Sequence, residues 1–215
     1  MDEKLLILIN QRWTSPVLDK SMAAFSSFDA WAAIFVILIV ILLIKGDFRM
    51  RAFLLTAGIV VAINDGVVAH ALKRIVDRPR PHQVLDDVRQ IDLAKARPRL
   101  LALFKPVRIK SSHASIENVE GRSFPSAHTV NCFSVALVAV CFFGVRVWWG
   151  FLVAALVAYS RIYTGSHWPS DVATSIFVGL GSTFLLLALA ERIWQMTGRR
   201  WLPAVHAAHP SLLAV

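Results

Sequence analysis

The sequence predicts an all-α integral membrane protein, a helical bundle of about five transmembrane helices with an N-terminal interfacial helix and a long polar loop between spans 2 and 3. Of its 215 residues, 56% are hydrophobic and only 17% are charged, and the mean hydropathy is +0.58. These values are too apolar for an ordinary soluble domain of this size. Lipid is therefore the expected solvent for much of the chain.

The predicted elements follow in order along the chain. Residues 3–13 predict a short interfacial helix. A membrane-spanning helix needs roughly 20 mostly apolar residues. Five stretches approach this length: 22–44, 52–72, 125–145, 147–164 and 171–191.

The long polar segment, about residues 73–124, separates the second and third spans and is rich in Arg, Lys, Pro and Ser. Its middle, residues 86–104, has apolar residues at helical spacing, interrupted by Pro98. This pattern predicts short interfacial helices there.

Five spans place the N-terminus, the long segment and the turn at 161–170 on one face of the membrane, and the short connections and the C-terminal tail on the other. The short-loop face is basic, which predicts that it is cytoplasmic; its cations are Lys45, Arg49, Arg51, Arg146, Arg192, Arg199 and Arg200. The long segment is basic too, but part of its charge is explained by the chemistry described below. We expect a protein of the cell (inner) membrane with its active site on the outer or periplasmic face.

The formal net charge of +9 fits either a nucleic-acid surface or a surface for lipid headgroups and phosphate. The hydrophobic runs favour the second, so we expect membrane lipids as partners and no nucleic acid. Cys132 and Cys141 lie within one apolar run and indicate neither a disulfide framework nor a zinc site.

Three clusters of polar residues stand at predicted span ends on the same face: Lys73 with Arg80, Ser126 with His128, and Arg161 with His167 and Asp171. Together they supply three cations, one hydroxyl, two imidazoles and one carboxylate. Positioned cations stabilise the charge that a phosphoryl group spreads over its oxygens during transfer. The clusters therefore predict a phosphate site.

Two histidines in one phosphate site suggest that one attacks phosphorus while the other protonates the leaving alkoxide. Asp171 follows His167 by four residues, and Pro169 indicates that a helix begins between them, so the carboxylate could accept the proton on the second ring nitrogen of His167. Pro125 before Ser126 suits the first turn of another helix, whose free N–H groups would face an anion.

Three segments carry a specific resemblance. Residues 73–81 read KRIVDRPRP, residues 125–128 read PSAH, and residues 160–171 read SRIYTGSHWPSD. They resemble the three-part signature of the type 2 phosphatidic acid phosphatase (PAP2) superfamily, which also includes vanadium haloperoxidases. Ala127 stands where the family pattern has Gly, and Ala is the better residue if this position is helical.

The resemblance extends from about residue 60 to about residue 185. It implies that the whole chain, 1–215, is a single membrane-embedded phosphatase domain. By matching positions, it implies that His167 is the nucleophile, with Asp171 as its partner and His128 as general acid. Phosphate would be held by four further residues: Lys73, Arg80, Ser126 and Arg161. The family needs no metal, and we expect no cofactor.

The leading hypothesis is the dephosphorylation of a membrane lipid phosphate or pyrophosphate, of polyprenyl, phosphatidic acid, phosphatidylglycerol phosphate or lipid A type. The alternatives are a lipid phosphotransferase on the same scaffold and a non-catalytic membrane protein that binds anionic lipid. Haloperoxidase chemistry shares the segments, but five apolar spans argue against it. Within the second span, Asn64, Asp65 and His70 need polar partners, and for His70 we favour a structural hydrogen bond.

Overall fold

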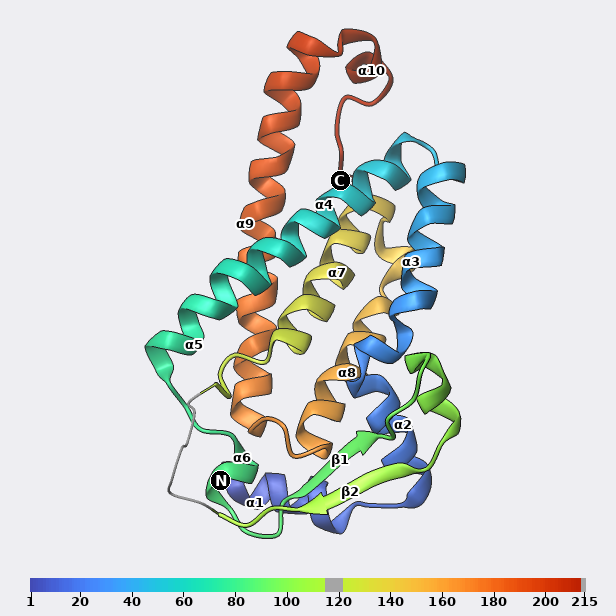
Figure 1. Ribbon diagram of the computed structural model, residues 1–215. Helices are drawn as coiled ribbons and strands as arrows, with labels where there is room; N and C mark the ends of the chain where they lie inside the picture. Colours follow the sequence, from blue (N-terminus) through green and yellow to red (C-terminus); the bar gives the residue numbers. More distant parts are fainter. Residues whose placement is uncertain (115–121, 214–215) are drawn as a thin grey trace.

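The computed structural model describes residues 1–114 and 122–213, and its fold is mostly helical (Figure 1). Helix α7 lies in the middle of the bundle and packs against α4, α8 and α9. The long helical elements are α2 (Pro16–Ser26), α3 (Phe28–Lys45), α4 (Phe48–Ile63), α7 (Ala127–Phe143), α8 (Gly150–Tyr163) and α9 (Pro169–Trp201). The short ones are α1 (Asp2–Ile7), α5 (His70–Val76), α6 (Pro81–Val84), α10 (Pro203–Ala208), the π-helical turns η1 (Leu8–Arg12) and η2 (Asn64–Ala69), and the 3-10 turns η3 (Arg99–Phe104) and η4 (Val145–Val147).

Four helical stretches in the described part of the chain are long and apolar enough to cross a membrane: Phe28–Lys45, Phe48–Val84, Val145–Tyr163 and Pro169–Trp201. The expected third span corresponds to α7, which is apolar but has only 17 residues. The first span begins later than predicted, because residues 22–26 complete α2 and α3 starts at Phe28. Only 6% of α3 (Phe28–Lys45) is buried, so its side chains face outward all round the helix, as they would in lipid.

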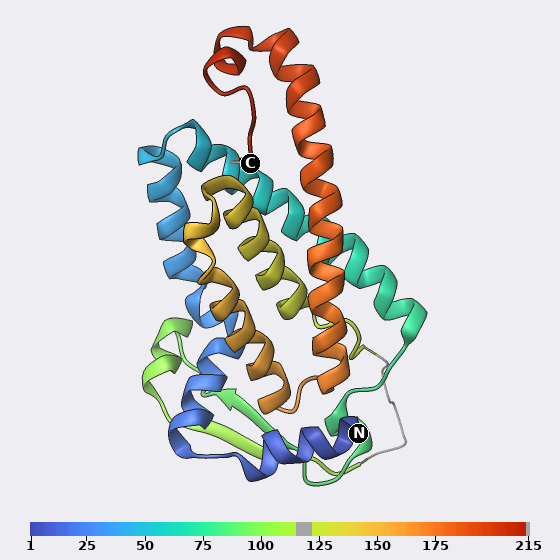
Figure 2. The ribbon, with the colours of Figure 1, turned by 180° about the vertical axis from the view of Figure 1, so that it is seen from behind.

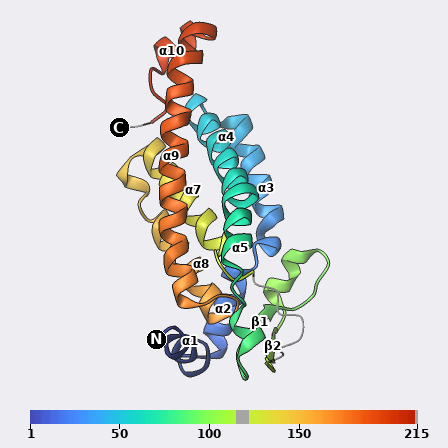
Figure 3. The ribbon, with the colours of Figure 1, turned by 90° about the vertical axis from the view of Figure 1, so that its left-hand side faces the viewer.

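The helix ends and connections lie at two opposite ends of the molecule. Helices α1, α2 and α6 and the turn between α8 and α9 lie at one end of the molecule, which we call the head end (Figures 1 and 2). The α3–α4 connection and α10 lie at the other end, and the view from the side shows the same separation (Figure 3). The helical character of residues 3–13 is confirmed by α1 and η1.

Polar and small residues join η2, α7 and α9 inside the helical bundle. The amide of Asn64 is buried in η2 and donates to Ser134 Oγ of α7 at 2.8 Å and to Thr183 Oγ1 of α9 at 3.3 Å. A Cβ on Gly179 would lie 2.7 Å from the carbonyl oxygen of Val130, so α7 and α9 touch backbone to backbone. Such contacts are typical of membrane helix packing. They give the amide nitrogen of Asn64 two partners and join it to α7 and α9, whereas its Oδ1 is buried without a hydrogen-bond partner among the described residues.

The segment after α6 corrects the all-α prediction. Strands β1 (Arg89–Leu93) and β2 (Val107–Ser111) form an antiparallel two-stranded sheet, with Ile91 opposite Ile109. Ile91 and Leu93 are buried whereas the residue between them is exposed, which is the period of a strand. The apolar positions of residues 89–93 fit both the period of a helix and that of a strand. These residues form a strand because they pair with the second strand at 107–111. The prediction of short helices at 86–104 holds only for η3.

A buried carboxylate joins the hairpin to the bundle. Asp19 of α2 accepts from Arg89 of β1 at 2.7 Å and from the Tyr163 hydroxyl of α8 at 2.7 Å. The side-chain amide of Asn10 donates to the carbonyl oxygens of both Arg89 and Tyr163. The N-terminal helices, the hairpin and the end of α8 are therefore held together as one unit.

Candidate active site

The residues singled out in the sequence all lie at helix ends or in connections that meet towards the head end: Lys73 in α5, Arg80 before α6, Ser126 and His128 at the start of α7, Arg161 near the end of α8, His167 in the α8–α9 turn, and Asp171 in the first turn of α9. Lys73, Arg80 and Arg161 lie within electrostatic reach of the His128 ring. Arg80, Arg161 and His128 likewise lie within electrostatic reach of the His167 ring. The structure thus brings the two histidines and three cations into one cluster.

The His167 ring has a defined tautomer. It is buried, with 4% of the residue exposed, and its Nδ1 lies 2.6 Å from the carbonyl oxygen of Ser123. A carbonyl oxygen can only accept, so Nδ1 carries the hydrogen and Nε2 of the neutral ring is the nitrogen with the free lone pair. Burial, assisted by the charges of Arg161 and Arg80, lowers the pKa of His167 well below its ordinary value. The ring is therefore neutral near pH 7.

The carboxylate of Asp171 is fully buried but is not the direct partner of His167. Its Oδ2 accepts from the Ser123 hydroxyl at 2.5 Å and from the Trp168 N–H at 3.2 Å, and its Oδ1 accepts from Arg78 at 2.6 Å. The predicted bond from Nδ1 to the carboxylate is replaced by one from Nδ1 to the Ser123 carbonyl. The reason is that α9 begins at Pro169, so Asp171 turns back to cap its own helix.

Arg78 links this carboxylate to the N-terminus of the chain. One guanidinium nitrogen contacts Asp171, and the other lies 2.7 Å from Asp2 Oδ2 of α1. The guanidinium also lies over the Trp168 ring, 5.2 Å from its centroid. Asp2 accepts from the backbone N–H of Ser170 as well. Burial tends to raise the pKa of Asp2, but the hydrogen bonds from Ser170 and Arg78 outweigh it and lower the pKa. Negative, positive and negative charges alternate along the line of contacts from Asp2 through Arg78 to Asp171.

The junction between α2 and α3 orients two further site residues. Arg161 donates through one terminal nitrogen to the carbonyl oxygen of Ser26 at 3.1 Å and to the Ser26 hydroxyl. Its Nε is buried and has no hydrogen-bond partner within residues 1–114 and 122–213. The His128 ring stacks on Phe28, with ring centroids 4.6 Å apart. A guanidinium anchored on one side with a donor left over on the other is suited to hold an oxyanion.

Ser126 is buried and precedes the first residue of α7. Its backbone N–H donates to Ser175 Oγ at 2.8 Å, and its own Oγ accepts from the Thr129 hydroxyl at 3.1 Å. Ala127 opens the helix, so the residue that departs from the family pattern is helical. The positive end of the α7 dipole and the N–H groups of its first turn lie where an anion would be stabilised.

Five residues of this arrangement were not predicted from the sequence: Asp2, Ser26, Phe28, Arg78 and Ser123. Arg78 and Ser123 lie within or directly beside two of the motif segments, so their closeness to Arg80 and Pro125 was an available signal. The other three lie far away in the sequence, and only the packing of α1, α2 and α3 brings them to the site.

A family model described as the PAP2 superfamily matches residues 52–195, which is more than half of the chain. The chain belongs to the PAP2 superfamily. The matched range contains all seven of the predicted site residues, from Lys73 to Asp171. The resemblance that the three short segments carry is therefore confirmed over a much longer stretch.

This PAP2 protein is similar to lipid A 4'-phosphatase of Bacteroides thetaiotaomicron, with 24% identity over 196 residues, 90% of this chain and 78% of that protein. Other relatives match over shorter segments, and the chain spans less than half of their length. Undecaprenyl-diphosphatase BcrC of Bacillus subtilis is 28% identical over 88 residues, 40% of this chain and 45% of that protein. The crystal structure of Aquifex aeolicus LpxE superposes with a TM-score of 0.60 at 25% identity, covering 87% of this chain and 94% of that one. The protein is thus an integral membrane member of a family of lipid phosphatases.

Proposed function

We propose that this PAP2 protein hydrolyses a phosphate ester or pyrophosphate of a membrane lipid through a phosphohistidine on His167, without a metal. The observation that carries the proposal is the bond between His167 Nδ1 and the Ser123 carbonyl, which leaves Nε2 as the free nucleophile beside cations. An imidazole that is neutral and has one fixed tautomer is the form required for attack on phosphorus.

In the proposed reaction, Nε2 of His167 attacks phosphorus and the bond from phosphorus to the lipid oxygen breaks. A proton on His128 passes to the leaving oxygen. His128 then accepts a proton from water as that water attacks the phosphohistidine, which releases phosphate and restores neutral His167. Asp171 acts on the nucleophile through Ser123, because its carboxylate holds the hydroxyl of the residue whose carbonyl fixes the ring.

The transferring phosphoryl group would be held by Lys73, Arg80, Ser126 and Arg161. The Nε of Arg161, which has no hydrogen-bond partner in the described part of the chain, and the first turn of α7 support this assignment, since both present donors to an anion. A lipid could keep its tail beside the membrane helices while its phosphate lies at the head end.

The names of the relatives suggest lipid A and undecaprenyl diphosphate as substrate types. We further propose that the whole chain works as one phosphatase domain, that α7 counts as a fifth span, and that the head end faces the outer or periplasmic side. Labelling of single cysteines introduced between residues 82 and 114 tests the orientation: reaction with an impermeant reagent in intact cells supports it, and reaction only after permeabilisation refutes it.

The central experiment measures phosphate release from a panel of lipid phosphates by the purified protein in EDTA. Wild type is compared with His167→Ala, His128→Ala and the control His206→Ala, which changes a histidine in α10 at the opposite end of the molecule. We expect loss of release in the first two variants only, and an acid-labile phosphoenzyme in wild type. Activity that is indifferent to His167 or abolished by EDTA would refute the mechanism. A phosphorylated acceptor without free phosphate would identify a phosphotransferase instead.

A further inference from the structure

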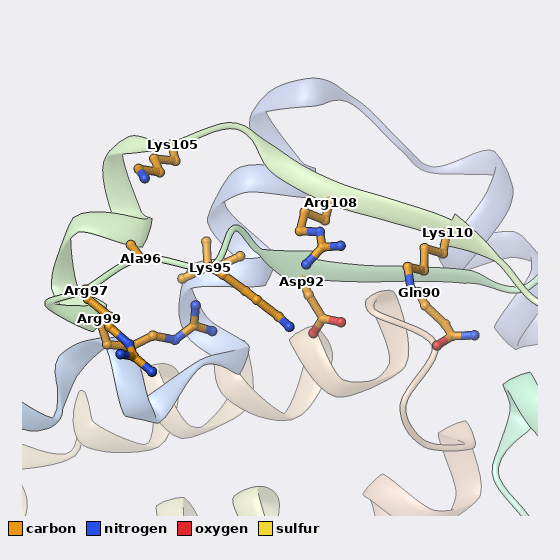
Figure 4. A pocket seen from close by; sticks show the side chains of 10 residues that line it. Gln90, Asp92, Lys95, Ala96, Arg97, Arg99, Lys105, Arg108 and Lys110 are labelled. Carbon is orange, nitrogen blue, oxygen red and sulfur yellow. The ribbon is translucent and has the colours of Figure 1, made fainter.

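A cavity of about 710 Å³ lies at the head end, between the β-hairpin and the chain that joins its strands (Figure 4). Its size falls within the usual range for sites of small molecules, about 300–1,000 Å³. Of its ten lining residues, Asp92 is the only acidic one. Six are cationic: Lys95, Arg97, Arg99, Lys105, Arg108 and Lys110. The cavity is therefore strongly basic.

The cationic side chains are positioned by the pairing of the two strands and by an ion pair. In the hairpin register Asp92 pairs with Arg108 and Gln90 with Lys110, so these four side chains share one face of the sheet. On the opposite wall, Arg99 Nε lies 2.5 Å from Asp29 and fastens η3 to the first turn of α3. The two walls are thus set by backbone pairing and by an ion pair.

Arg99 is the one member of the six that forms an ion pair within the described residues, 1–114 and 122–213. The other five are exposed to solvent and crowd around one concave space. Like charges held close together repel one another, and a bound anion removes that repulsion. A concave wall with several donors also suits a phosphate or carboxylate better than a flat basic patch does.

The cavity borders the proposed phosphate site. Asp92, which lines it, lies within electrostatic reach of Arg161 and of His82 in α6. A lipid whose reacting phosphate is held near Arg161 would therefore direct the rest of a large headgroup towards the hairpin. A headgroup that ends at the reacting phosphate would leave the cavity empty.

We propose that this cavity binds a second anionic group of the substrate headgroup, so that the protein selects lipids bearing a phosphate or carboxylate in addition to the one that reacts. The proposal rests on the proposed phosphatase function for the location of the first phosphate. Its substrate class is an anionic saccharide lipid such as lipid A with phosphates at both ends of its disaccharide, rather than a lipid with a single phosphate.

Equilibrium binding tests the proposal without requiring turnover. The background is His167→Ala protein in zwitterionic micelles, so that the lipid is not consumed, and the probes are lipid A with two phosphates and lipid A with one. We expect the two-phosphate lipid to bind at least about tenfold more tightly, as expected from the loss of one or more charge-assisted bonds. Arg108→Gln with Lys110→Gln should remove this preference. The control Lys4→Gln with Arg12→Gln removes the same charge from exposed positions that do not line the cavity and should retain it.

Equal dissociation constants for the two lipids in the background protein would overturn the proposal. An equal loss of affinity for both lipids in the hairpin variant would also overturn it, because this indicates general attraction to anions. Excess phosphatidylglycerol in the micelles distinguishes the source of the anion: a preference that survives supports a group on the same headgroup, and one that disappears assigns the cavity to a neighbouring lipid. Failure of the phosphatase proposal would appear separately, as absent phosphate release from wild type.

Discussion

Replacement of Ser123 by alanine is the sharpest test of how His167, the proposed nucleophile, is held. The hydroxyl of Ser123 donates to the buried Asp171 carboxylate at 2.5 Å, while the carbonyl of the same residue accepts from His167 Nδ1 at 2.6 Å. A hydrogen bond to a charged group contributes about 1.5 to 3 kcal/mol, and its loss should lower the free energy of unfolding by this order. Asp171 keeps Arg78 and the Trp168 N–H, so we place the loss at the lower end of this range.

Without the bond from residue 123 to Asp171, its backbone carbonyl would be less firmly positioned and would hold the ring of His167 less firmly, so part of the loss should appear in the transition state. A loss of about 1.4 kcal/mol there corresponds to a roughly tenfold lower kcat. KM should change little, because none of the four proposed phosphate-binding residues is altered. The assay is steady-state phosphate release combined with thermal unfolding in the same detergent.

Ser134→Ala is the matched control for this variant. Ser134 is equally buried, accepts from Asn64 and donates to the Val130 carbonyl within α7. Its replacement should lower stability without lowering kcat. The reasoning is refuted if Ser123→Ala loses stability but keeps the kcat of wild type, or if Ser134→Ala loses kcat to the same extent.

Three further predictions follow from the contacts. The His167 ring should stay neutral when the pH falls from 8 to 6, because its pKa is lowered. The contribution of the neutral ring to the free energy of unfolding is full above the ordinary pKa of 6.5 and is lost as the pH falls through the pKa of the folded state. An NMR titration midpoint of His167 at 6.5 or higher would contradict this. Gly179→Ala should lower the free energy of unfolding by about 1 to 3 kcal/mol, since its Cβ would meet the Val130 carbonyl, whereas Gly181→Ala meets nothing within 4 Å and should not; equal melting temperatures would contradict this. Asp2→Asn should cost about 1 kcal/mol or less near pH 7, because its ion pair is partly exposed. The difference should be full above the ordinary pKa of 3.8 and should be lost as the pH falls through the lowered pKa of folded Asp2; a difference that persists at the acid end of the unfolding curves would argue against the ion pair.

The sequence predicted most of the membrane core and the clustering of the site. Long apolar runs are set by bilayer thickness, so the spans could be read from composition, and polar side chains at span ends could be assigned to one face from the order of the spans. The head end was harder because its short elements owe their form to partners distant in the sequence. Residues 89–93 form a strand only because residues 107–111 pair with them.

The interaction between His167 and Asp171 shows where spacing alone is insufficient. Two residues four apart lie on one face only if both are inside the helix. Here α9 starts between them, so the carboxylate caps the helix and the ring bonds to Ser123, which lies 44 residues earlier. The role of Ser123 depends on this long-range contact and could not be deduced from the motif segment that contains the histidine.

The cations of the site fall into two groups: one is paired with carboxylates, and the other forms no ion pair within the described residues. Arg78 is paired with Asp2 and Asp171, so its charge is already balanced and it holds together the structure around His167. Two positions further on, Arg80 forms no ion pair within the described residues, and neither do Lys73 and Arg161. Cations held together without carboxylates raise the electrostatic energy of the empty site. A phosphate dianion would relieve that energy, and stabilisation would be greatest when negative charge spreads over the phosphoryl oxygens in the transition state. The segment DRPRP thus combines one arginine that pairs with two carboxylates and one, Arg80, that has no ion pair within the described residues and that we propose binds the substrate phosphate.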